Sequence, residues 1–308
     1  MEGAVQGDEG HCKVRVLFSV LAVCVSLMVS AAPVRKGPVE TEHRKVPYVG
    51  AISADAATGR ILFSDKADAE AYPASVTKLM TALLVLEDVE KGRYSFSSLA
   101  TATKDVNRCE ASWVGLKAGQ SMTVDDLLTA LLVQSANDAA IVLGVNSAGS
   151  LEAFVERMNE RARELGMENT AYYNPNGLPK PKYAKEFNRT TAADQLKLAL
   201  EIVKHEMIFK YTSVKLGQVK DGNGNIIKFV NHNNVMVKDK LKVINPDSSE
   251  AVDGLKTGYI EAGGSSVVLS GSRAGKRAIV VVLGSASAPD RDNAARRLME
   301  DALSSLSW

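Results

Sequence analysis

Residues 72–87, YPASVTKLMTALLVLE, constrain the fold most, because they place a hydroxyl and a primary amine at the start of an apolar helix. Ser75 and Lys78 are three residues apart, which is one helical turn, so both side chains fall on the same face. The positions that follow are too apolar for a solvent-facing helix, so we expect this helix to be buried. A lysine in such a place loses hydration, which lowers its pKa and makes it a plausible base. The competing interpretation is that Ser75 caps the helix and Lys78 reaches back to water.

Size and charge limit the class of protein. The chain has 308 residues with 45% hydrophobic and 24% charged residues, which is typical of a soluble globular protein of one or two domains. The net charge of +1 excludes the strongly basic surface of a nucleic-acid binder, so we expect no nucleic-acid partner.

The N-terminus has the features of a secretory signal. Lys13 and Arg15 precede the uncharged apolar run of residues 16–29, and small residues follow at 30–32. We therefore expect a signal peptide over residues 1–31, a linker over 32–46, and export to the periplasm or cell envelope. An uncleaved signal anchor is the alternative; it would attach the chain to the inner membrane, and membrane contact is expected only in that case.

Cysteine usage agrees with this arrangement. Cys12 and Cys24 belong to the expected signal, so the mature chain would keep only Cys109 and could form no intramolecular disulfide. A domain of this size does not need one. Cys109 has no histidine in its segment, so a buried or surface thiol is a better interpretation than a nucleophile.

The pattern along the chain predicts an α+β protein. A β-hairpin turns at Thr58-Gly59, and helices follow up to about residue 205, with N-caps expected at Thr123 and Ser150. Residues 174–188 should form a long surface loop. After residue 210 we expect a hairpin around 221–225, strands at 252–260, 265–273 and 277–286, and a closing helix over about 290–306 whose apolar stripe packs on a sheet.

The turn segment DGNGN at 221–225 resembles the start of a calcium loop. Ile226 stands where such a loop requires glycine, and no glutamate closes it, so a plain turn is predicted. We expect no metal site and no cofactor.

Three short motifs occur once each and in a fixed order: the serine–lysine pair, SAN at 135–137 and KTG at 256–258. Each motif alone is weak evidence. Ser135 or Asn137 could simply cap a helix, and KTG could be an ordinary strand and turn. The ordered set, however, is typical of penicillin-recognising serine enzymes.

The chemistry of that class needs these residue types. Ser75 would be the nucleophile and Lys78 the base that removes its proton, without a histidine. Ser135 could relay a proton, and Asn137 could hold a substrate amide by its donor and its acceptor. Lys256 would lower the pKa of Lys78 and attract a substrate carboxylate. The KTG strand offers an edge for an extended peptide, and Gly258 permits close approach.

Longer segments resemble one family. PASVTKLMTALLVLE, LLVQSANDAA, LGMENTAYYNPNGL, VDGLKTGYIEAGG and AIVVVLGS look like the low-molecular-mass penicillin-binding proteins, the serine D-alanyl-D-alanine carboxypeptidases. The resemblance covers about Val46 to Leu306. It implies a β-lactamase/transpeptidase-like fold: a five-stranded antiparallel sheet flanked by helices, plus an all-helical lobe at about 85–205 within a catalytic domain at 47–308.

The resemblance also implies site roles. Ser75 would form an acyl-enzyme, with an oxyanion hole from the N–H groups of Ser75 and Tyr259. Thr257 would bind the terminal carboxylate, and Arg291 matches an arginine near it, although a surface salt bridge is an almost equal interpretation. Peptidoglycan stem peptides would be the substrates and β-lactam antibiotics the covalent inhibitors.

Departures from the family keep several functions open. We expect no second C-terminal domain in addition to the catalytic domain at 47–308. This arrangement resembles the short, single-domain D,D-endopeptidases, but those tend to have glutamate where this chain has Ala136. Asn176 stands where many relatives have histidine, so it is assigned no catalytic role. A D,D-carboxypeptidase is the first hypothesis and a D,D-endopeptidase the second. A β-lactamase would need a deacylating carboxylate, and Glu186 has the wrong spacing to Asn188; a non-catalytic binder would not need a paired serine and lysine.

Overall fold

The computed structural model describes residues 47–108, 111–179, 186–221, 223–237 and 251–306. The expected signal peptide, the linker at 32–46 and Cys109 lie outside the described residues. Within the described residues, no single helix is long and apolar enough to cross a membrane; only helices α3 (Asn137–Ala148) and α4 (Leu151–Glu164) taken together, bent by 86°, meet that length and composition.

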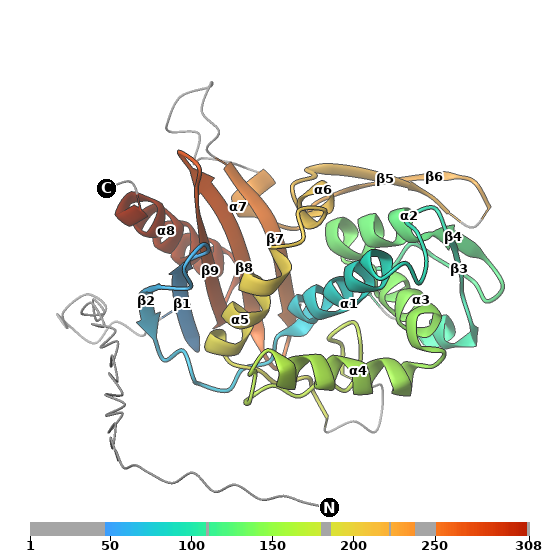
Figure 1. The fold of residues 1–308 in the computed structure, drawn as a ribbon, viewed down its shortest axis with the longest axis horizontal. Coiled ribbons are helices and arrows are strands. Elements are labelled where there is room, and N and C mark those ends of the chain that lie inside the picture. The colour runs from blue at the N-terminus through green and yellow to red at the C-terminus, as the bar shows by residue number, and fades with distance from the viewer. Residues whose placement is uncertain (1–46, 109–110, 180–185, 222, 238–250, 307–308) are drawn as a thin grey trace, which may run out of the picture. The chain divides into compact units, whose positions relative to one another are not determined.

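A five-stranded antiparallel sheet forms the centre of the fold, in the order β2-β1-β9-β8-β7 (Figure 1). The strands are β1 (Gly50–Asp55), β2 (Ile61–Asp65), β7 (Ala251–Ile260), β8 (Gly264–Arg273) and β9 (Lys276–Ser285). The predicted N-terminal hairpin and the three C-terminal strands are therefore confirmed. Strand β7, which carries KTG, lies at an edge of the sheet, as expected.

Both faces of the sheet are covered, and the alternation of β9 shows why. Ile279, Val281 and Leu283 point into one hydrophobic core, while Ala278, Val280 and Val282 belong to the other. Helix α8 (Ala288–Leu306) packs on the second face with its predicted apolar stripe (Figure 1). Helix α5 (Ala192–Ile202) packs on the first face, against β1 and β9.

Four helices lie beside the sheet and form the helical lobe (Figure 1). They are α1 (Lys78–Glu90), α2 (Val124–Thr129), α3 (Asn137–Ala148) and α4 (Leu151–Glu164). The Thr123 hydroxyl accepts a hydrogen bond from the Asp126 N–H at the start of α2, and the Ser150 hydroxyl accepts from the Ala153 N–H at the start of α4. Both predicted N-caps are thus confirmed.

The helical pattern did not predict every element of this lobe. Strands β3 (Leu99–Thr101) and β4 (Ser121–Thr123) form a small ribbon, and a 3₁₀ segment spans Lys104–Arg108. The predicted hairpin around 221–225 is present as β5 (Leu216–Lys220) and β6 (Ile226–Val230), between the short helices α6 (Ile208–Thr212) and α7 (Asn234–Val237). The Asp221 carboxylate accepts N–H groups of Asn223 and Asn225, so it closes a turn.

Candidate active site

Ser75 lies in a single 3₁₀ turn, Ala74–Thr77, that leads directly into helix α1. Lys78 is the first residue of that helix, and its side chain has 0% exposure. Neither residue follows the competing interpretation: the hydroxyl of Ser75 is not a helix cap, and Lys78 does not extend to water. The short turn places Ser75 just before the helix N-terminus, where its hydroxyl is in contact with the Lys78 amine.

The Lys78 amine contacts three oxygen atoms. Its Nζ lies 2.9 Å from Ser75 Oγ, 2.7 Å from Asn137 Oδ1 and 2.8 Å from the backbone O of Asn176. The amide and peptide oxygens can only accept, so they engage two N–H groups of the amine. In a neutral amine, the lone pair then faces the Ser75 hydroxyl. This arrangement orients Lys78 to take the serine proton.

An irregular helix end presents the SAN motif. Helix α2 passes into a π-helical turn, Ala130–Gln134, and Ser135 then adopts a left-handed conformation (φ 62°, ψ 32°). A serine in this region is uncommon and is held by its surroundings. The reversal lets Asn137 begin α3 and direct its side-chain oxygen toward Lys78. Ser135 and Asn137 are both buried.

The NPNGL segment contributes backbone groups to the site. Besides the Asn176 carbonyl on Lys78, the Pro175 carbonyl accepts from the Thr81 hydroxyl at 2.7 Å. Gly177 (φ +86°) lies so close to Ala74 that a Cβ there would fall 1.8 Å from the Ala74 oxygen. This role was not predicted from the sequence, where only the side chain of Asn176 was considered; the Asn-Gly pair after a proline was the available indication.

Strand β7 runs against the serine turn. A Cβ on Gly258 would lie 2.6 Å from the Pro73 oxygen and 3.0 Å from the Ser75 nitrogen, so only glycine permits this approach. The KTG motif therefore meets the serine–lysine pair, as the ordered motifs predicted.

Lys256 is almost completely buried on the same strand. Burial, and then the charge of Arg291, lowers its pKa to about 7. Its Nζ donates to the Thr257 backbone oxygen at 3.0 Å. Thr257 is buried beside it, whereas Tyr259 is 64% exposed.

Arg291 is buried near the N-terminal end of α8, so the alternative of a surface salt bridge is wrong in placing this residue at the surface. It still forms an ion pair, because its Nε and Nη2 donate to Asp292 Oδ1 at 2.9 and 2.7 Å. His232 lies in the same neighbourhood and was not singled out from the sequence. Although His232 is exposed at the surface, partial desolvation of its ring, and then the charges of Lys256, Lys78 and Arg291, lowers its pKa.

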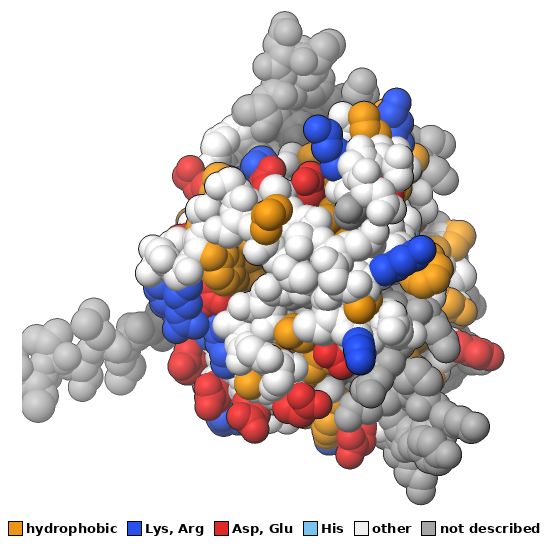
Figure 2. Space-filling model, turned by 90° about the vertical axis from the view of Figure 1, so that its right-hand side faces the viewer, with side chains coloured by type: hydrophobic (Ala, Val, Ile, Leu, Met, Phe, Trp, Pro, Cys, Tyr) orange, Lys and Arg blue, Asp and Glu red, His pale blue; other side chains and the backbone are white. Residues whose placement is uncertain are grey.

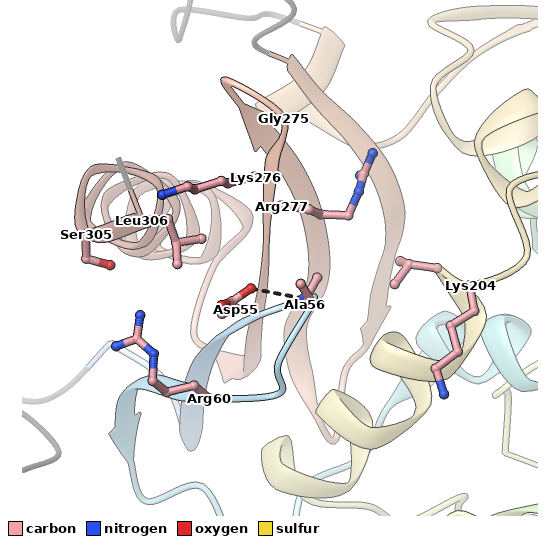
Figure 3. A pocket seen from close by; sticks show the side chains of 11 residues that line it. Asp55, Ala56, Arg60, Lys204, Gly275, Lys276, Arg277, Ser305 and Leu306 are labelled. Carbon is pink, nitrogen blue, oxygen red and sulfur yellow. Dashed lines mark hydrogen bonds between the residues drawn. The ribbon is translucent and has the colours of Figure 1, made fainter. Parts of the chain in front are cut away.

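Other candidates lie apart from this site. Glu186 is exposed, as expected for a solvated loop glutamate. Glu87, Glu201 and His205 approach one another within 4.8 Å, but the Arg161 guanidinium bonds both carboxylates, so an ion-pair network accounts for the group. A cavity of about 460 Å³ lies between the β1–β2 and β8–β9 turns and the ends of α5 and α8 (Figure 3). None of the predicted site residues lines it.

The chain matches the peptidase family described as D-alanyl-D-alanine carboxypeptidase over residues 39–287. It is 31% identical to D-alanyl-D-alanine carboxypeptidase DacF of Bacillus subtilis over 247 residues, which are 80% of this chain and 60% of that protein. It is 29% identical to a D-alanyl-D-alanine endopeptidase of Pseudomonas aeruginosa over 194 residues, 63% of this chain and 59% of that protein. The chain thus spans about 60% of the length of these curated relatives.

Solved structures share the fold. Penicillin-binding protein D2 from Listeria monocytogenes, in its ampicillin-bound form, has a TM-score of 0.69 and 28% sequence identity, over 85% of this chain and 99% of that chain. The predicted sheet of five antiparallel strands with flanking helices is therefore the transpeptidase-like fold of penicillin-binding proteins.

Proposed function

Because the chain belongs to the D-alanyl-D-alanine carboxypeptidase family, we propose that it removes the terminal D-alanine from peptidoglycan stem peptides through an acyl-enzyme on Ser75. The observation that carries this proposal is the buried amine of Lys78, held 2.9 Å from the serine oxygen by two further acceptors.

Acylation begins when Ser75 Oγ attacks the carbonyl carbon of the penultimate residue and its proton passes to Lys78 Nζ. The peptide bond then breaks, and the leaving D-alanine nitrogen takes up a proton from Lys78, relayed by Ser135. In deacylation, water attacks the ester while Lys78 accepts a proton from it and returns one to Ser75 Oγ. In acylation and in deacylation, Lys78 accepts one proton and then returns one, so a single base serves both reactions.

Developing charge on the carbonyl oxygen is stabilised by the N–H groups of Ser75 and Tyr259. The close approach of Gly258 to the serine turn supports this pairing of donors. Lys256 and Arg291 supply positive charge for the substrate carboxylate, with Thr257 donating its hydroxyl. Asn137 orients the substrate amide on the helical side.

A D,D-endopeptidase that cuts cross-links with the same residues is the second candidate. Similarity to an endopeptidase of Pseudomonas aeruginosa favours keeping it. Both reactions cleave a bond on the carboxyl side of D-alanine, and they differ in the amine that leaves.

The signal-like N-terminus supports export to the periplasm or cell envelope, where peptidoglycan is available, with inner-membrane attachment if the signal is retained. β-Lactams would acylate Ser75 as covalent inhibitors. A role in peptidoglycan metabolism and cell shape follows from the same substrate.

Two experiments test the proposal. Purified protein should become labelled by a fluorescent penicillin, and Ser75→Ala should abolish the label; a label that survives the change refutes Ser75 as nucleophile. Mass spectrometry of products from a pentapeptide muropeptide and from a cross-linked dimer then distinguishes the two reactions. Release of free D-alanine from the pentapeptide supports the carboxypeptidase, and conversion of dimer to monomers alone supports the endopeptidase.

A further inference from the structure

The β5–β6 hairpin packs one face on the helical lobe and exposes the other. Val219 and Phe229 on the inner face are buried in the first hydrophobic core, beside the π-helical turn Ala130–Gln134. Side chains alternate between the two faces of a strand, so every second residue points outward. The outward residues, all exposed, are Leu216, Gln218 and Lys220 on β5 and Ile226, Lys228 and Val230 on β6.

These six residues, called the hairpin face below, combine aliphatic and basic side chains. Leu216 lies opposite Val230 across the two strands, and the two side chains are 76% and 51% exposed. Ile226 is 59% exposed and lies opposite Lys220 at the other end of the ribbon. Residues opposite each other on antiparallel strands are neighbours, so an aliphatic pair lies at one end of the hairpin face and a mixed pair at the other.

Hydrogen bonds hold the hairpin at its turn and at its base. At the turn, Gln120 Nε2 donates to Asn223 Oδ1 at 2.7 Å, which connects the hairpin to the segment before β4. At the base, the Asn231 N–H donates to the Lys215 carbonyl and Asn231 Nδ2 donates to the Val214 carbonyl, both at 2.9 Å. The hairpin face is therefore already ordered before it contacts any partner, which lowers the cost of binding.

Charge is distributed unevenly over this end of the molecule. Residues 215–230 carry three lysines and one carboxylate, Asp221, which accepts N–H groups within its own turn. Helix α4 lies on the opposite side of the helical lobe (Figure 1) and exposes Glu152, Glu156, Glu160, Glu164 and Arg163. Figure 2 shows basic and hydrophobic side chains together near the top, at the height of the hairpin, and acidic side chains along the lower edge. An anionic surface would therefore attract the hairpin side and repel the α4 side.

The composition of the hairpin face favours a lipid surface over a protein partner. Protein interfaces are enriched in aromatic residues and depleted in lysine, whereas the hairpin face has two lysines and no aromatic residue. Lysine beside aliphatic side chains is typical of segments that lie at the boundary between water and lipid. The aliphatic groups enter the acyl region there, while the lysine stems lie along it and the amines reach the phosphates.

We propose that the hairpin face docks the protein on a bilayer that contains anionic phospholipid. Leu216, Ile226 and Val230 would enter the acyl boundary, and Lys220 and Lys228 would bind headgroup phosphates. Attraction between the lysines and the phosphates adds to the burial of only three aliphatic side chains, and both are needed for stable contact. The proposal is independent of the reaction at Ser75, and the docking does not require a retained signal.

Quenching by lipid measures contact at a chosen residue. Ile226→Trp in the full chain places an indole on the hairpin face, and Glu160→Trp places one on the exposed side of α4. With vesicles of phosphatidylglycerol and phosphatidylcholine that carry bromine on their acyl chains, the indole at 226 should be quenched and that at 160 should not, relative to the parent protein. Equal quenching at both positions, or none at either, would overturn the proposal. An inserted signal would affect both reporters alike.

The lysines are tested in the Ile226→Trp protein. Lys220→Gln together with Lys228→Gln should lower the docking equilibrium constant, measured from the same quenching, by on the order of 30-fold, or about fivefold for each lysine near an anionic surface. Lys66→Gln with Lys276→Gln is the matched control, because these exposed lysines lie on the sheet side and remove the same charge. The control should dock like the parent. An equal loss in both proteins would show that net charge acts and not the hairpin face.

A second copy of the chain is the other occupant to be tested. Sedimentation velocity without lipid should show a monomer, which leaves the hairpin face free for the bilayer. A dimer that dissociates when Leu216→Ser and Val230→Ser are combined would assign the hairpin face to self-association and overturn the proposal.

Discussion

Lys78 has no exposed surface, so it can act on Ser75 only in the orientation that its neighbours allow. With Asn137 and Asn176 taking two N–H groups, the third position of the amine faces the serine oxygen. Lys78→Ala should slow acylation by fluorescent penicillin by on the order of 10²-fold or more, since the serine loses its base. Time-resolved labelling measures this rate, and an unchanged rate would remove Lys78 from the mechanism.

In the proposed reaction, Lys256 should confer sensitivity to alkaline pH. Its pKa of about 7, set by burial and by Arg291, means that it is charged below this pH and loses its charge above it. Attraction of the substrate carboxylate should therefore weaken as pH rises, and kcat/KM should fall by up to about tenfold per pH unit on that account. Lys256→Arg keeps the charge and should lose this alkaline decrease in a kcat/KM profile. The same decrease in the variant would show that another group titrates.

The loop at 174–178 supports the serine turn through backbone contacts. Gly177→Ala would place a methyl group against the Ala74 carbonyl and also strain a left-handed backbone, so the serine turn must move. We expect loss of penicillin labelling together with reduced stability.

Gly149 provides the matched control for that change. It has nearly the same φ (+87°), but nothing lies within 4 Å of its added Cβ. Gly149→Ala should therefore cost about 1 kcal/mol of stability through backbone strain alone and leave labelling intact. Equal labelling by both variants would show that the contact with Ala74 does not position the serine.

Helices α1, α3 and α4 are joined by one buried carboxylate. Asp88 of α1 accepts from Arg157 at 2.7 Å and from the Ser147 hydroxyl at 2.5 Å, and Arg93 lies 2.9 Å away. Burial alone would raise the pKa of Asp88, but the hydrogen bonds from Arg157 and Ser147, with the charges of Arg157 and Arg93, hold it below its usual value. The network is thus complete at neutral pH.

Asp88→Asn should lower the free energy of unfolding at pH 7 by about 3–5 kcal/mol, because the partner cation stays partly buried without its counter-charge. A carboxylate with a lowered pKa stabilises the fold above its unfolded pKa, and this contribution is lost as pH falls through the folded pKa. The difference between wild type and variant in urea denaturation should therefore shrink at acidic pH. A difference that stays constant down to about pH 2 would exclude the charge of Asp88 as the cause.

The sequence predicted the parts of this protein that depend on local pattern. Alternating residues predicted the N-terminal hairpin, short apolar runs predicted the three C-terminal strands, and Thr123 and Ser150 predicted helix starts. The ordered motifs predicted that Ser75, Lys78, Asn137 and Gly258 meet. The parts that it did not predict depend on contacts between distant segments. No sequence pattern indicates that the backbone carbonyl of Asn176 would accept a hydrogen bond from Lys78. The spacing of apolar residues before Ser135 predicts a regular helix, whereas the structure has a π-helical turn there.

The site itself joins the two parts of the described chain. Ser75 and Lys78 connect the sheet side to α1, Asn137 comes from the helical lobe, and β7 closes the other side. A ligand attached to Ser75 and contacting both sides must be released or exposed before either part unfolds, so it should stabilise both together.

We therefore expect the ampicillin adduct to unfold in a single transition at a higher midpoint than the free protein. A gain of about 2 kcal/mol would raise Tm by roughly 3–4 °C for a chain of this size. Differential scanning calorimetry measures the shift, and Ser75→Ala, which cannot form the adduct, should show no shift with the same antibiotic. If the adduct instead splits the transition in two, with only one part stabilised, the ligand contacts one side of the site alone, and the roles given to Asn137 and β7 cannot both hold.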